Sequence, residues 1–151
     1  MPIRRASAIE EIIGSVPLET WERAALKDYH PLIRTPRAAT RLLNTYRLVR
    51  AGVPAEEWET FRGDEETSGE FRIAMLLLAA AAGLPAKARE WFTRLRNADP
   101  TALFLSEIDD DRDRAWQKFK TVFDATFVSS PQTLTNELFS KWIDRVERFA
   151  F

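Results

Sequence analysis

The sequence predicts an all-α fold, a single domain of about seven helices that spans residues 1–151. Three observations carry this prediction. Apolar residues recur at spacings of three and four, prolines and glycines fall where helices would begin and end, and no stretch shows sustained alternation of apolar and polar residues. With 151 residues, of which 45% are hydrophobic, the chain is long enough to bury a sizeable core.

The first two predicted helices lie before the Pro31 break. Ser7 and Glu10 have the spacing of a capping box, in which each side chain satisfies a backbone donor, and they predict a short helix over residues 7–14. Apolar residues at helical spacing predict a second helix over residues 18–30. It should end where Pro31 disfavours helical geometry in the residue before it.

The third predicted helix has a clear start and a clear end. Thr35 is a natural N-cap, and Pro36 is a natural first helical residue because its missing N–H is not needed there. Gly52 supplies the matching stop. Pro54 then begins a short helix that carries aromatic residues.

A very apolar helix follows and ends at Gly83. Thr67 and Glu70 repeat the capping-box spacing before it. The run at residues 73–84 is apolar on every face, so we expect a buried central helix against which the others pack. The run is shorter than the roughly 20 residues that span a bilayer, and the next helix is predicted to open at Pro85.

The last third of the chain is predicted to be helical as well. Asp99 and Pro100 are a further cap and helix start, and an amphipathic helix is expected over residues 111–127. The final helix is predicted to begin at the Ser-Pro pair that ends at Pro131. The closing residues 148–151 either extend it or form an edge strand.

Composition excludes several classes of site. The chain has no cysteine, which removes disulfides and cysteine-ligated metals, and its single histidine, His30, rules out a multi-histidine metal site. The N-terminus lacks the hydrophobic core of a signal peptide, so we expect a cytoplasmic protein with no membrane segment. A net charge of −1 argues against nucleic acid as a partner and makes any electrostatic function local. The five tryptophans mostly fall on apolar stripes and are expected in the core.

Familiar catalytic and ligand-binding motifs are absent from the sequence. The acidic cluster at residues 109–114 does not fit a calcium-binding EF-hand loop, because Arg114 and Lys120 stand where glycine and glutamate are needed. We expect its aspartates to favour a helix start instead. No glycine-rich phosphate loop occurs, and no nucleophile or carboxylate pair is persuasive, so neither metal binding nor catalysis is expected of this chain alone.

The most unusual segment is residues 30–52, which holds five arginines and no carboxylate. On a helical wheel, Arg37, Arg41 and Asn44 share the exposed side at spacings of four and three. The opposite, buried arc comprises Ala38, Ala39, Leu42, Leu43, Tyr46 and Val49. A cation in the first turn opposes the helix dipole, which is tolerable if an anion such as phosphate lies between Arg37 and the N–H groups of that turn. The alternative is that Arg37 is solvated or pairs with an acid elsewhere in the fold.

The order of motifs resembles a known protein family. The series TPRAATRLLNTYRLVRAG, VPAEEWETFRG and GEFRIAMLLLAAAAGLPAKAREWFTRL resembles the helical region that follows the ATP-binding core in bacterial P-loop NTPases of the KAP and related STAND type. In those proteins a Ser/Thr-Pro-Arg sequence opens a helix and a very apolar helix ends near Gly-x-Pro. The resemblance covers residues 18–98, and residues 99–151 form a C-terminal helical extension.

The resemblance implies a role for the arginine-rich helix. Arg37 is similar to the second sensor arginine of AAA-type ATPases, which reaches the γ-phosphate of ATP, with Arg41 and Asn44 as neighbours that orient it or contact the core domain. An arginine suits this role because its guanidinium binds phosphate oxygens in a bidentate manner. The Walker lysine and the whole nucleotide-binding sheet are missing, so ATP would be bound only together with a P-loop NTPase core in cis or in trans.

The sequence therefore predicts a helical lid or regulatory domain that senses bound ATP and is not an enzyme by itself. Two alternatives stay open. The arginine-rich face could bind an acidic protein partner as an interaction module, or the helix could bind DNA as part of a helix-turn-helix domain. The near-neutral total charge makes DNA binding the weaker of the two.

Overall fold

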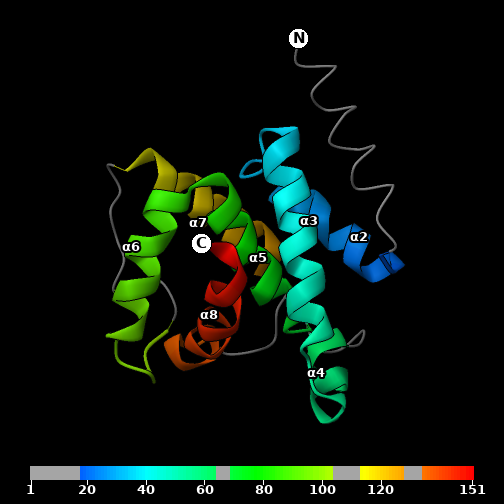
Figure 1. The fold of residues 1–151 in the computed structure, drawn as a ribbon. Helices are drawn as coiled ribbons and strands as arrows, with labels where there is room; N and C mark the ends of the chain where they lie inside the picture. The colour runs from blue at the N-terminus through cyan, green and yellow to red at the C-terminus, as the bar shows by residue number, and fades with distance from the viewer. Residues whose placement is uncertain (1–17, 64–68, 104–112, 128–133) are drawn as a thin grey trace.

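A computed structural model describes residues 18–63, 69–103, 113–127 and 134–151. These residues form seven α-helices, so the predicted all-α class is confirmed (Figure 1). The elements are α2 Thr20–Leu26, η1 Lys27–Tyr29, α3 Pro36–Ala51, η2 Ala55–Glu57, α4 Trp58–Arg62, α5 Phe71–Gly83, α6 Pro85–Arg96, α7 Arg114–Phe127 and α8 Asn136–Ala150, where η marks a 3-10 helix. The helix predicted over residues 7–14 lies outside the described residues.

Helix α5 is the centre of the packing, as its sequence predicts. Ten of its 13 residues are buried, and α3, α6, α7 and α8 all pack against it. Figure 1 shows α5 between α3 on one side and α6 on the other. Because no face of α5 is polar, burial on all sides is the only arrangement that removes its apolar surface from water. Among the described helices, none is long and apolar enough to cross a bilayer.

The C-terminal end of α5 touches backbone rather than side chains. A Cβ atom added to Gly83 would lie 2.0 Å from the carbonyl oxygen of Leu32, in the segment between η1 and α3. Only glycine permits this approach without displacing the backbone. The contact fixes the distance between the end of α5 and the chain that leads into α3.

Helix α3 has the predicted boundaries. Thr35 is the N-cap, and its hydroxyl oxygen accepts a hydrogen bond from the N–H of Ala38 at 3.1 Å. Pro36 is the first helical residue and Gly52 follows the last turn. The predicted capping box before α5 falls partly outside the described residues, because Thr67 is not described.

The prediction of a helix that starts at Pro100 is wrong for residues 99–103, which are not helical. The Asp99 carboxylate accepts hydrogen bonds from both the N–H and the hydroxyl of Thr101, at 3.0 and 2.9 Å, which closes a local turn instead of capping a helix. Leu103 then forms an isolated antiparallel bridge with Thr135. This bridge joins two segments that are far apart in the sequence.

The two C-terminal helices begin later than predicted. Helix α7 starts at Arg114 rather than residue 111, since the Asp113 carboxylate accepts the N–H of Ala115 at 2.9 Å. Helix α8 is capped by the Thr135 hydroxyl and does not begin near residue 131. It continues to Ala150, so the edge strand considered for residues 148–151 is wrong.

The tryptophans are core residues, as predicted. Trp91, Trp116 and Trp142 are buried, and Trp21 and Trp58 are half-buried and pack against the core. Burying such large rings is a strong stabilising contribution.

Replacing Gly83 by alanine should destabilise the protein. The added methyl group would overlap the Leu32 carbonyl, and overpacking of this kind costs about 1–3 kcal/mol of unfolding free energy. Chemical denaturation monitored by circular dichroism measures the loss. Gly52→Ala is the matched control, because a Cβ there meets only ordinary contacts, the nearest being 3.5 Å from the Val49 carbonyl oxygen. Equal unfolding free energies for the two variants would contradict the proposed close approach.

Candidate functional site

The four arginines of α3 fall into two groups. Arg50 turns inward and forms an ion pair with Glu22 of α2 at 2.9 Å, and it approaches Glu19 at 3.8 Å. Its guanidinium also lies 5.5 Å from the ring centroid of Trp58. The charge of Arg50 is therefore met by acids of another helix, which explains how α3 manages without a carboxylate of its own.

Glu22 is a fully buried carboxylate with three donors. It accepts hydrogen bonds from the Tyr46 hydroxyl, from Arg50 at 2.9 Å and from the backbone N–H of Glu19 at 3.0 Å. Burial and the neighbouring carboxylate raise the pKa of Tyr46 far above its usual range, so this hydroxyl stays a donor. A buried charge is stable only when paired in this way, and the cluster joins α2 to α3.

The sequence contains a signal for this cluster that motif reasoning missed. Glu22 stands four residues after Leu18 and three before Ala25, which places it on the apolar side of its helix. An acid in that position needs a buried cation or donor.

The other three arginines lie on the outer side of α3. Arg37, Arg41 and Asn44 are all exposed and share one stripe, in the order their spacing predicts. Leu48 continues this stripe one turn further, and Arg47 flanks it. We call this surface the α3 face, defined as Arg37, Arg41, Asn44, Arg47 and Leu48.

Arg37 occupies the first turn of α3, and its side chain makes no ion pair or hydrogen bond with the described part of the chain. The backbone around Arg37 offers fewer free N–H donors than the sequence predicts. Thr35 already accepts the N–H groups of Ala38 and Ala39, and Pro36 has no N–H. One backbone donor, the N–H of Arg37 itself, is left beside the guanidinium for an anion.

Arg41 has a structural contact. Its guanidinium donates a hydrogen bond to the backbone carbonyl of Ala150, in the last turn of α8. Carbonyl groups at a helix C-terminus lack intrahelical donors and carry partial negative charge, so a cation there is stabilising. Arg41 therefore holds α8 beside α3 in addition to any role toward a ligand.

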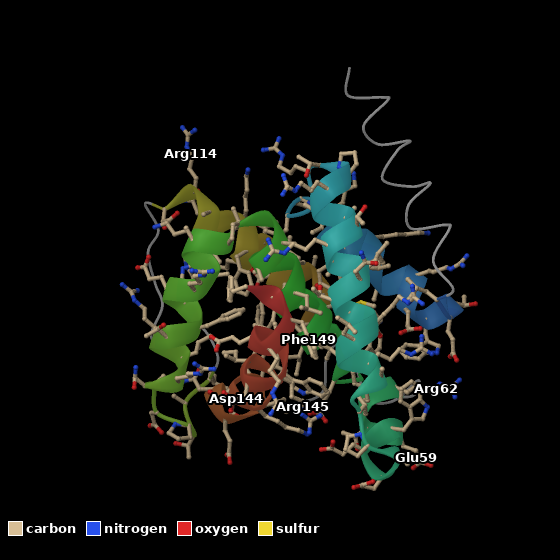
Figure 2. All side chains as sticks on the ribbon, in the orientation of Figure 1. Glu59, Arg62, Arg114, Asp144, Arg145 and Phe149 are labelled. Carbon is tan, nitrogen blue, oxygen red and sulfur yellow. The ribbon has the colours of Figure 1, made fainter. Side chains whose placement is uncertain are left out.

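An apolar residue lies among these polar ones. Leu48 has 51% of its surface exposed, and it lines an open hollow of about 400 Å³ together with Asn44 and Arg47. On the neighbouring helix α8, Phe149 is 39% exposed. Figure 2 shows Phe149 and Arg145 leaving α8 on the side toward α3. The wheel could have flagged Leu48, since it falls on the polar stripe rather than in the buried arc.

A second polar cluster, on α8, pairs its cations with carboxylates of the same fold, although Nη1 of Arg145 is buried with no hydrogen-bond partner in the described part of the chain. Glu70 accepts hydrogen bonds from the Trp142 indole at 3.0 Å and from Lys141 at 3.3 Å, and Arg145 pairs with Glu57 at 2.8 Å. The hydrogen bond from Arg145 lowers the pKa of Glu57. Each cation here has a carboxylate, which makes this cluster a connection between α8 and the α4–α5 region rather than a binding site.

No metal-binding group is found among the described residues, where no three acidic, histidine or cysteine side chains are suitably arranged. His30 is exposed beside η1. The comparisons with known proteins identify no relative, since no protein-family model, curated protein or solved structure matches this chain. The resemblance to KAP and STAND NTPases thus stays a prediction from the motifs alone.

Removing the Tyr46 hydroxyl should cost more than removing the Tyr29 hydroxyl. Tyr46→Phe takes a donor from a buried carboxylate, which should lower the unfolding free energy by about 1.5–3 kcal/mol. Tyr29→Phe removes a bond to the neutral carbonyl of Arg72 and should cost about 0.5–1.5 kcal/mol. Both rings are fully buried, so the pair is matched for packing. Urea titrations of the two variants measure the difference, and the reverse order would contradict the larger contribution assigned to the Tyr46–Glu22 hydrogen bond.

Proposed function

We propose that this chain is a helical binding module whose α3 face docks on an acidic surface of a partner protein or domain. One observation supports the proposal above the others. Arg50 has its charge met by Glu22 inside the fold, whereas Arg37 and Arg47 are exposed and make no ion pair with any described residue. Arg41 bonds only to a backbone carbonyl among the described residues.

The physical case rests on local charge. The net charge of the whole chain is −1, so attraction acts only near the α3 face, within a Debye length of about 8 Å at physiological salt. Rows of like charge on a rigid helix steer an oppositely charged partner and suppress wrong ones. Single exposed ion pairs are weak, at about 0–1 kcal/mol each, so several must act together.

The test of docking is charge reversal at two positions of the α3 face. The double variant Arg37→Glu with Arg47→Glu should weaken binding of a fluorescent glutamate-rich peptide by at least about tenfold in an anisotropy titration. Arg41 is left intact, because its loss would also break the contact with Ala150. Arg114→Glu is the matched control, an exposed arginine in the first turn of α7 (Figure 2).

Two results would count against acidic docking. Equal weakening by the Arg114 control would make the attraction nonspecific. Tighter binding of a DNA duplex than of the peptide, falling steeply with salt, would favour the DNA-binding alternative instead.

The second candidate function is the lid or regulatory domain of a P-loop ATPase, with Arg37 as its phosphate sensor. The exposed position of Arg37 in the first turn of α3 favours it, because a guanidinium and a free N–H can meet an anion there. Under this proposal the partner is a P-loop core in cis or in trans, ATP is bound mainly by that core, and the assembly is cytoplasmic and bacterial. This chain would contribute no catalysis alone, and Arg41 and Asn44 would contact the core.

The ATPase candidate has its own test. The reading frames adjoining this gene should encode a P-loop protein, and ATP turnover of the joined proteins should fall at least about tenfold in Arg37→Ala. Arg114→Ala is the control and should leave turnover unchanged. Neighbouring frames without a P-loop, or unchanged turnover in Arg37→Ala, would remove this candidate and leave the docking proposal standing.

A further inference from the structure

We infer that the segment docking on the α3 face is an acidic amphipathic helix that places one apolar side chain beside Leu48. This inference rests on the proposed docking function and names the chemistry of the partner. Its basis is the combination of an exposed leucine, a hollow and three arginines on the α3 face.

The apolar part of the α3 face is Leu48, which is unusual because a leucine is exposed next to polar side chains. Leu48 is 51% exposed at the C-terminal end of a polar stripe, and the hollow beside it measures about 400 Å³. An apolar anchor in a pocket with a polar rim is the usual energetic centre of a protein interface. Arg47 and Asn44, which also line the hollow, supply that rim.

The arginines of the α3 face favour a partner with acidic side chains. Helix α3 contains four arginines and no acidic residue. A partner with lysine or arginine near this helix would be repelled, whereas glutamate and aspartate would be attracted.

The geometry favours a helix over an extended peptide. Arg37, Arg41, Asn44 and Leu48 follow one another at spacings of four, three and four, which forms a stripe about 16 Å long at 1.5 Å per residue. Such a stripe matches the seam along which two helices pack. An extended peptide would need partners for its own backbone, and a helix surface offers no edge to pair with, whereas a docking helix satisfies its backbone internally.

Helix α8 would bound the docked helix on one side. Phe149 is 39% exposed and projects from α8 toward α3 (Figure 2). Arg41 links the two helices at this level through its bond to Ala150. The docked helix would thus meet apolar side chains from α3 and α8 and arginines along its length.

The experiment selects the partner chemistry directly. The full chain is the bait for a displayed library of helical peptides whose seam positions are randomised. We expect enrichment of glutamate or aspartate at spacings of three and four, together with one large apolar residue. For an enriched peptide, Leu48→Ala should weaken binding by about tenfold. Leu103→Ala is the matched control, since Leu103 is 58% exposed on another part of the molecule.

The outcomes separate this inference from the docking proposal. Enrichment of acids without an apolar residue, or equal affinity of Leu48→Ala and wild type, overturns the anchor and leaves acidic docking intact. Peptides that bind equally well to Arg37→Glu with Arg47→Glu overturn both. If no peptide is enriched, the inference is overturned. It is also overturned if sedimentation shows a dimer of this chain that Leu48→Ala abolishes, because the occupant of the α3 face would then be a second copy.

Discussion

The complete burial of α5 is the constraint on which the remaining structure depends. A helix without a polar face must be covered on every side, and here α3, α6, α7 and α8 cover it. Gly83 lets the end of α5 meet the Leu32 carbonyl, which sets where the chain enters α3. The inner side of α3 is thereby committed to the core, and its outer side is left to carry the arginines.

Helix α3 satisfies its polar groups in two different ways. Toward the core, Tyr46 and Arg50 meet the buried carboxylate of Glu22, so a charge that would be costly alone becomes a connection between helices. On the outer side, Arg37 and Arg47 carry charges that no described residue neutralises. The inner contacts hold the helix in one position, and a rigid helix presents a binding surface with little loss of conformational entropy on docking.

Helix boundaries could be predicted where a side chain acts on its own backbone. Thr35 and Pro36 fix the start of α3 because their effects reach only a few residues. The same reasoning fails at Pro100, where the Asp99 carboxylate closes a turn with Thr101. The competing influence there is long-range, since backbone N–H groups at the start of α8 donate to the carbonyls of residues 100 and 102. A local pattern cannot anticipate a partner more than thirty residues away.

The sequence by itself determined the helical class, the buried role of α5 and the common stripe of Arg37, Arg41 and Asn44. Each of these follows from the period of a helix and from composition, which are local properties. Only the tertiary structure decided which arginine of α3 is neutralised internally, and that Leu48 is left exposed on the outer side of α3. The reason is that ion pairing and burial depend on which helices become neighbours, and packing around α5 sets those neighbours.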